Sequence, residues 1–268
     1  MARSYNPEKY RLDKQEALTK AYPELVKVEQ LALQYAPINV NWYNPHFVLQ
    51  PATGQFLDIH QYFYQVISAF PNKASDAAGV RLLYNLWETN SQKIVGVLRI
   101  SSDFLRLGPR DKYLGLTKGF EDRKQVTLQL KGVIPLPPFN QMAGGKLLTA
   151  LAFSNNVQQE IRTKGQFCGL SVCSIYGESI IYDRIPYLKF LGETVKGTGV
   201  YFGPTATNYR EFIEGKEDVL KMIDRPDSEI IKWWQPLYER RLAKVPHDAS
   251  IEEFKITSKV KPMAQNLF

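Results

Sequence analysis

The segment that most constrains the fold of this 268-residue chain joins a β-rich run to a helical one between residues 126 and 152. β-Branched and alternating apolar residues fill 126–134 and predict a strand, and leucines at helical spacing begin at Leu147. Between them, Gly144 and Gly145 would leave backbone N–H groups of the first helical turn uncovered. A helix N-terminus of this kind attracts phosphate, so the turn is a candidate anion site; a plain connection is the alternative reading.

Strand patterns on both sides of this segment predict a sheet. Residues 80–87 and 94–100 read as two strands joined by a polar turn, which is typical of an antiparallel hairpin. The charged connection 101–124 has room for one short helix. A helix over about 145–163 and a strand over 167–176 follow the glycine turn. The predicted order is therefore hairpin, strand, glycine turn, helix, strand.

Helical patterns flank this central part. Residues 9–35 carry an imperfect apolar stripe and 58–67 a second periodic segment, whereas 37–53 is rich in Asn, Pro and aromatic residues and is expected to be irregular. The chain beyond residue 208 reads as helical. Its last part, beyond residue 249, is polar and is expected to form an extended arm or a loosely ordered end.

Composition places the chain among globular proteins and gives it a positive charge. It is 44% hydrophobic, and 34 Lys and Arg residues against 27 Asp and Glu give a net charge of +7. This balance favours polyanions as partners, nucleic acid first, with DNA preferred; a basic surface without a specific partner is the alternative. Apolar runs stay well below the roughly 20 residues of a membrane span, and the N-terminus lacks a secretory pattern, so we expect a cytoplasmic location without membrane association.

Cysteine and histidine positions give no metal-site pattern. Cys168 and Cys173 lie five residues apart, so on one strand they would point to opposite faces, and neither a disulfide nor a metal pair is expected. His46, His60 and His247 are scattered along the chain. The sequence therefore predicts no metal site, although a site assembled from distant residues stays open.

The order of elements resembles the central part of the GNAT acyltransferase superfamily. There, a pyrophosphate loop of Gln/Arg-x-x-Gly-x-Gly/Ala type between a strand and a helix holds acyl-coenzyme A. Gln141 and Gly144 match this motif and Gly145 occupies its next, variable position, whereas Lys146 stands where Gly or Ala is usual. The resemblance implies that these four residues bind acetyl-coenzyme A or a related acyl-coenzyme A. The Lys146 side chain would either obstruct the pyrophosphate or pair with it.

A second block sharpens the comparison. Residues 171–182, followed by 187–197 with Gly192, Thr194 and Gly197, are similar to the strand, tyrosine segment and glycine-containing tail of phage Mom-type DNA modification proteins. A similar tail occurs in the A subunit of the Druantia anti-phage system, which residues 96–115 also resemble. These resemblances, which cover about residues 80 to 200, imply action on DNA bases in a phage or anti-phage setting.

The same comparison supplies candidate catalytic residues. Tyr182 matches the family's tyrosine, which implicates it in positioning the acyl group or the base. Glu178 is the nearest carboxylate and would serve as general base. The alternative readings are a packing aromatic for Tyr182 and an exposed turn carboxylate for Glu178. The cations expected to contact nucleic acid are Lys189, Lys196 and Arg184.

Together these observations predict an α/β (α+β) protein with a GNAT-like mixed, mostly antiparallel sheet flanked by helices. We expect an N-terminal helical extension over residues 1–75, the GNAT-like core over 76–207 and a C-terminal helical segment and tail over 208–268. The expected function is transfer of an acyl-type group to DNA bases.

Three other functions compete with this one. A non-catalytic DNA-binding protein would need only the basic surface, and a phage structural protein would not bind nucleic acid. A metal-dependent nuclease would need clustered carboxylates. The local candidates for that cluster are Asp103, Asp111, Glu121 and Asp122.

Overall fold

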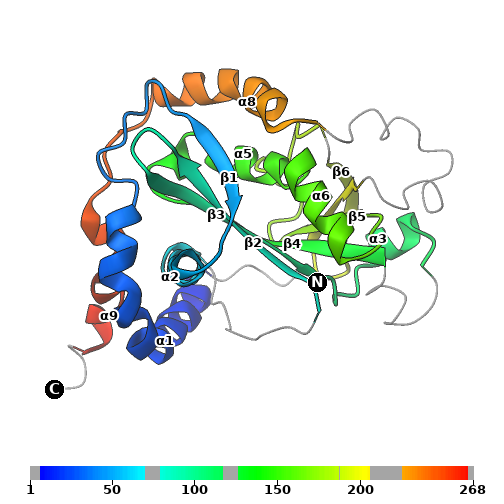
Figure 1. Ribbon diagram of the computed structural model, residues 1–268. Coiled ribbons are helices and arrows are strands. Elements are labelled where there is room, and N and C mark those ends of the chain that lie inside the picture. Colours follow the sequence, from blue (N-terminus) through cyan, green and yellow to red (C-terminus); the bar gives the residue numbers. More distant parts are fainter. Residues whose placement is uncertain (1–6, 70–78, 117–125, 187, 206–224, 265–268) are drawn as a thin grey trace.

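The computed structural model describes residues 7–69, 79–116, 126–186, 188–205 and 225–264 (Figure 1). Its strands are β1 (Phe47–Pro51), β2 (Arg81–Glu88), β3 (Lys93–Ser102), β4 (Thr127–Pro135), β5 (Gly169–Ser174), β6 (Lys189–Glu193) and β7 (Gly199–Pro204). Its longer helices are α1 (Pro7–Tyr35), α2 (Gln55–Ile67), α3 (Gly108–Tyr113), α5 (Gly144–Leu151), α6 (Asn155–Lys164), α8 (Asp227–Leu242) and α9 (Ile256–Ala264). Short 3₁₀ turns lie at Phe139–Gln141 and Ile251–Glu253.

Across the described residues the strands form one seven-stranded sheet in the order β1-β2-β3-β4-β5-β7-β6. Only β4 and β5 run parallel among these neighbours; the other pairs are antiparallel. The parallel pair needs a crossover, which α5 and α6 provide. The predicted fold class, a mixed and mostly antiparallel sheet flanked by helices, is confirmed, as is the β2–β3 hairpin.

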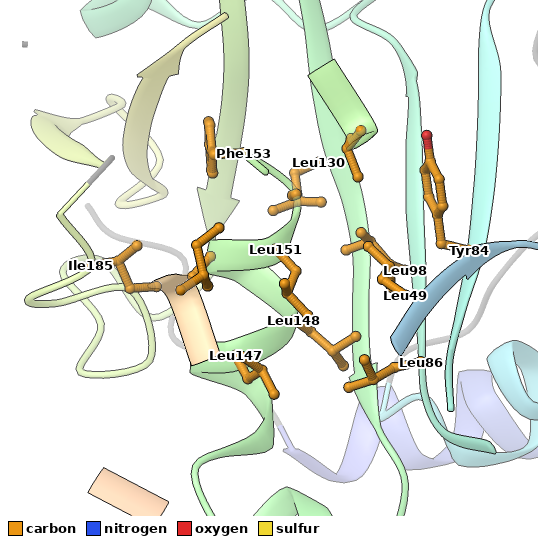
Figure 2. Close-up of a cluster of buried hydrophobic side chains, with 14 of the residues drawn as sticks. Leu49, Tyr84, Leu86, Leu98, Leu130, Leu147, Leu148, Leu151, Phe153 and Ile185 are labelled. Atoms are coloured by element: carbon orange, nitrogen blue, oxygen red, sulfur yellow. The ribbon is translucent and has the colours of Figure 1, made fainter. Parts of the chain in front are cut away.

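Helices cover both faces of the sheet (Figure 1). On one face, α5, α6 and α8 enclose the larger apolar core, in which Leu147, Leu148 and Leu151 of α5 lie against the sheet (Figure 2). On the other face, α1, α2 and α9 pack over β2, β3 and the end of β4. Because both faces are covered, β2 and β3 are buried along nearly their whole length and lack a simple apolar–polar alternation.

Strand β1 lies in the stretch 37–53, which the sequence indicates to be irregular, so that expectation is wrong at these residues. It pairs antiparallel with β2 from Phe47 opposite Glu88 to Pro51 opposite Tyr84. Pro51 fits there because β1 is the edge strand and its proline ends the ladder. β1 belongs to the predicted N-terminal extension yet completes the sheet. The predicted boundaries near residues 75 and 207 lie outside the described residues, and the division into three segments stays a prediction.

Two further expectations are wrong. The single helix expected over 145–163 is divided into α5 and α6 because Ser154 adopts an extended backbone conformation and begins a second helix as its N-cap. The expected extended arm beyond residue 249 is a 3₁₀ turn followed by α9. Phe254 and Ile256 are buried against the N-terminal helices, and the Tyr62 hydroxyl donates a hydrogen bond to the Phe254 carbonyl at 2.7 Å.

Among the described helices none is both long and apolar enough to cross a membrane.

Candidate functional site

The parallel pair β4–β5 separates at one end. Its residues pair from Thr127 opposite Gly169 to Leu130 opposite Val172, and pairing stops there although β4 continues to Pro135. The N-terminus of α5 lies at this splayed end, since Gly145 sits close to the side chains of Ile181 and Pro135. The turn after β5 therefore meets the start of α5 where the two strands part.

The two glycines of the turn have different environments. Gly144 is buried, and a Cβ atom there would lie 2.5 Å from Phe139 Cδ1 and 2.6 Å from the Phe139 carbonyl oxygen. Close packing therefore explains why residue 144 lacks a side chain. A Cβ atom at Gly145 would meet Ile181 Cγ2 at 3.6 Å, an ordinary contact. Gln141 is exposed in the preceding 3₁₀ turn.

Lys146 ties the turn after β5 to α5. Its ammonium donates hydrogen bonds to the carbonyl oxygens of Ile180 at 2.6 Å and Asp183 at 2.5 Å. Burial lowers the pKa of Lys146, Asp183 opposes this shift, and Arg184 and Arg241 add to it. Two cations from two other segments, Arg184 and Arg241, and one carboxylate thus lie within electrostatic reach of Lys146. We call Lys146, Arg184 and Arg241 the basic corner.

The predicted catalytic residues lie in the same turn. Tyr182 is half-buried with its ring centroid 5.2 Å from that of Tyr201, and burial, then Cys173 and Tyr201, raise the pKa of its phenol to about 12. At neutral pH it is therefore a hydrogen-bond donor and not a phenolate base. Glu178 is exposed and near enough to Tyr201 to contribute to the raised pKa of that residue. The catalytic roles of Tyr182 and Glu178 stay predictions.

The three cations predicted to contact nucleic acid are spread out. Arg184 is 88% exposed in its side chain and lies 3.5 Å from the Asp183 carboxylate. Lys189 begins β6 and stands over the Tyr113 ring, 5.7 Å from its centroid. Lys196 is exposed in the turn between β6 and β7. The structure therefore brings Arg184 together with Lys146 but places Lys189 and Lys196 toward opposite ends of β6.

A buried polar cluster beside β4 and β5 was not predicted from the sequence. The Arg110 guanidinium contacts Asp103 and also Asp111, at 2.6 Å, with the Arg110 and Asp103 side chains fully buried. The Ser171 hydroxyl of β5 donates a hydrogen bond to the Asp103 carboxylate. Burial works against the charge of Arg110, but Asp103 and Asp111 outweigh it and raise its pKa. The cluster thus links α3 to β5.

Only a weak signal in the sequence pointed to this cluster. Asp103 and Asp111 were candidate metal ligands of a nuclease, whereas in the structure both carboxylates bind Arg110. The two other candidates, Glu121 and Asp122, lie outside the described residues. Within the part of the chain that is described, no three His, Cys, Asp or Glu side chains group as a metal site would require.

Cys173 lies next to this cluster on β5. Gln129 Nε2 is 3.7 Å from its sulfur. Burial, followed by the Asp103 carboxylate, raises the pKa of the Cys173 thiol to about 11. Cys173 therefore stays a protonated thiol at neutral pH, and a nucleophilic role in the resting protein is disfavoured.

Fold and site define a mixed α/β protein in which a strand, a glycine turn, a helical crossover and a parallel strand surround a splayed end. The family model described as Druantia protein DruA matches residues 57–202, more than half of the 268-residue chain. The chain belongs to this family. The matched range contains the buried polar cluster and, apart from Arg241, the basic corner.

Two comparisons with individual proteins accompany the family match. Druantia protein DruA from Escherichia coli (strain UMEA 4076-1) is 26% identical over an alignment of 140 residues that covers 45% of this chain and 35% of that protein. The chain thus spans about a third of the length of this curated relative. The crystal structure of the AHL synthase LasI covers 64% of this chain and 96% of its own, with 10% identity and a TM-score of 0.37. A similarity this low adds nothing to the assignment of an activity.

Proposed function

We propose that this chain is a nucleic-acid-binding part of a Druantia-type anti-phage defence protein, and that DNA is held at the basic corner. The observation that carries this proposal is that Arg184 of the turn and Arg241 of α8 lie near enough to Lys146 of α5 to lower its pKa. Arg184 and Arg241 are exposed, so their guanidinium groups can reach a phosphate backbone. The net charge of +7 supports a polyanion as the partner.

A first test asks whether the protein binds DNA by its charge. Fluorescence anisotropy with labelled duplex and single-stranded oligonucleotides of one length, at salt concentrations from about 50 to 200 mM, gives the affinity for each. We expect affinity to fall steeply with salt because bound cations release counterions from the DNA. Weak binding that does not change with salt would contradict the proposal and would favour a protein partner.

Acyl-coenzyme A fits poorly at its predicted site, the glycine turn at the start of α5, in the conformation that the structure shows. Phe139 covers Gly144, Ile181 lies against Gly145, and the Lys146 ammonium is engaged by two carbonyl oxygens. A pyrophosphate at the first turn of α5 would require the turn over residues 179–184 to move. We therefore derive no catalytic step through this cofactor.

DNA base modification is the second candidate function, and Tyr182 favours it. A neutral phenol at the splayed end can donate a hydrogen bond to an extruded base or to a transferred group. We expect a modified nucleoside in DNA from cells that produce the wild-type protein and its loss with Tyr182→Phe, which removes only the hydroxyl. Mass spectrometry of digested DNA measures both.

The matched control for that experiment is Tyr113→Phe. Tyr113 contributes a ring to the packing around Phe202, away from the turn. Modification that persists in Tyr182→Phe at the wild-type level would leave Tyr182 as a packing residue. If DNA from cells that produce the wild-type protein contains no modified nucleoside, base modification is excluded and DNA binding remains the proposed function.

A further inference from the structure

A second basic site, a pocket, lies on the opposite side of the fold from the basic corner. It has a volume of about 280 Å³ and lies where α1 meets the end of α2 and the start of α9. Most of its lining residues precede or follow the family-matched range 57–202. It therefore belongs to the flanking helices of this chain and not to the splayed end.

Three cations line this pocket: Arg11 and Lys14 from α1, and Lys259 from α9. None of the described residues that line it carries a carboxylate. Lys14 donates a hydrogen bond to the Gln65 carbonyl in the last turn of α2, where a helix presents roughly half a negative charge. Among the described residues, three positive charges against that half leave roughly two and a half positive charges uncompensated.

The pKa of Lys14 agrees with an excess of positive charge in the pocket. Burial, and then repulsion from Lys259, lower the pKa of Lys14 to about 8. Among the described residues, no carboxylate contributes to that pKa. The charged form of an ammonium in such surroundings is stabilised when a dianion binds beside it, because the opposite charge offsets both the cost of burial and the repulsion from Lys259.

The pocket is built by contacts between distant parts of the chain. Lys14 links α1 to the end of α2, and the Gln15 amide of α1 donates a hydrogen bond to the Lys259 carbonyl of α9. The cations are therefore held on packed helices and not on a loop. Leu18 and Val66 add an apolar wall beside them.

We propose that this pocket binds a phosphomonoester dianion. Arg11 supplies a planar guanidinium that matches two phosphate oxygens, and Lys14 of the same helix and Lys259 of α9 supply ammonium groups. The volume is close to the lower limit of about 300 Å³ for small-ligand sites, which suits a nucleotide-sized group. A small nucleotide and the 5′-phosphate of a nucleic acid end carry the same dianion.

Isothermal calorimetry with the full chain tests this site with four probes. These are inorganic phosphate, a nucleoside 5′-monophosphate, and one short oligonucleotide prepared with either a 5′-phosphate or a 5′-hydroxyl. The test variant is Arg11→Gln/Lys259→Gln, which keeps the Lys14 link to α2. The control, Lys20→Gln/Lys27→Gln, removes the same charge from exposed positions of α1 outside the pocket.

We expect the wild type and the control to bind the monophosphate, and the pocket variant to bind it at least about tenfold more weakly because two charge-assisted contacts are lost. Preference for the monophosphate over both oligonucleotides identifies a small ligand. Preference for the 5′-phosphate over the 5′-hydroxyl oligonucleotide identifies a nucleic acid end. Equal monophosphate affinity in the pocket variant and the control would overturn the proposal, as would no binding of any phosphomonoester by the wild type.

Discussion

At the residue scale, the fold contains a histidine that cannot take up a proton without cost. His60 of α2 is fully buried, and its Nδ1 atom lies 3.1 Å from the Asn85 side-chain oxygen. Burial is the main cause that lowers its pKa to about 3; the Asn85 hydrogen bond opposes this shift and Arg99 reinforces it. The unfolded chain has the ordinary histidine pKa of about 6.5.

This difference predicts acid sensitivity. Below pH 6.5 the unfolded state binds a proton that the native state does not, so stability falls as the pH falls toward 3. Between pH 6.5 and 3, the decrease in the free energy of unfolding that this one group causes approaches about 1.4 kcal/mol per pH unit. Urea unfolding at pH 7.0 and at pH 5.5 measures this effect. From the higher to the lower pH, the free energy of unfolding should decrease by about 1 kcal/mol more in the wild type than in His60→Gln. Equal losses in both proteins would remove His60 as the cause.

The glycine turn gives a second prediction at this scale. Gly144→Ala should destabilise the protein by about 1–3 kcal/mol because its Cβ atom meets the Phe139 carbonyl oxygen. Gly145→Ala has room and should leave stability unchanged or slightly higher, since alanine favours the helix. Thermal unfolding of the two variants measures the difference. If Gly144→Ala were the more stable variant, close packing would not be the reason for Gly144.

At the element scale, the turn over residues 179–184 is held mainly from α5. Lys146 binds two of its carbonyl oxygens, and Ile185 at its end packs into the core beside Leu147 and Leu151 (Figure 2). Within the turn, the amides of Tyr182 and Asp183 both donate to the Ser179 carbonyl. The turn thus has an apolar anchor at Ile185 and a polar one at Lys146, and the Ser179 N–H also donates to the Tyr201 hydroxyl of β7 at 2.6 Å.

Removing the polar anchor should loosen the turn without unfolding the domain. In Lys146→Met the amides of Tyr182 and Asp183 should exchange hydrogen faster, because the turn loses both hydrogen bonds from α5 and keeps only Ile185 and its contacts with Tyr201. Hydrogen exchange followed by mass spectrometry measures this effect, with Lys131→Met, an exposed position on β4, as the control. Unchanged exchange in Lys146→Met would show that the two hydrogen bonds do not hold the turn.

The sequence predicts the elements with strong periodicity and misses those defined by tertiary contacts. The β2–β3 hairpin and the order of β4, α5 and β5 follow from local patterns. Strand β1 is short and acquires its identity only by pairing with β2. Helix α9 has no clear local signal and is fixed by burial of Phe254 and Ile256.

The candidate site divides in the same way. Residues of one segment, such as Gly144, Gly145 and Lys146, could be recognised by their local spacing. Arg241 could not be assigned to the same place because nearly a hundred residues separate it from Lys146 along the chain. In the sequence, Asp103 is a candidate metal ligand of a nuclease and Arg110 belongs to a charged connection, and only the structure shows that the two side chains are buried and paired.

At the scale of the whole molecule, the charged sites lie on packed parts of the fold. The basic corner combines α5, the turn after β5 and the end of α8, whereas the phosphomonoester pocket combines α1, α2 and α9. Helix α8 is fixed near the corner by Trp234, whose indole N–H donates to the Ala143 carbonyl at 2.9 Å. The corner is thus largely preorganised, which lowers the cost of binding a polyanion there.

The central claim is that DNA phosphates contact the basic corner, and the salt dependence of DNA binding tests it most directly. Fluorescence anisotropy compares the wild type, Arg184→Gln/Arg241→Gln, and the charge-matched control Lys131→Gln/Lys232→Gln, whose two lysines are exposed outside the corner. The slope of log affinity against log salt is negative. The account predicts that its magnitude decreases by about 2 in the corner variant and stays near the wild-type value in the control. Equal slopes in the corner variant and the control would contradict it.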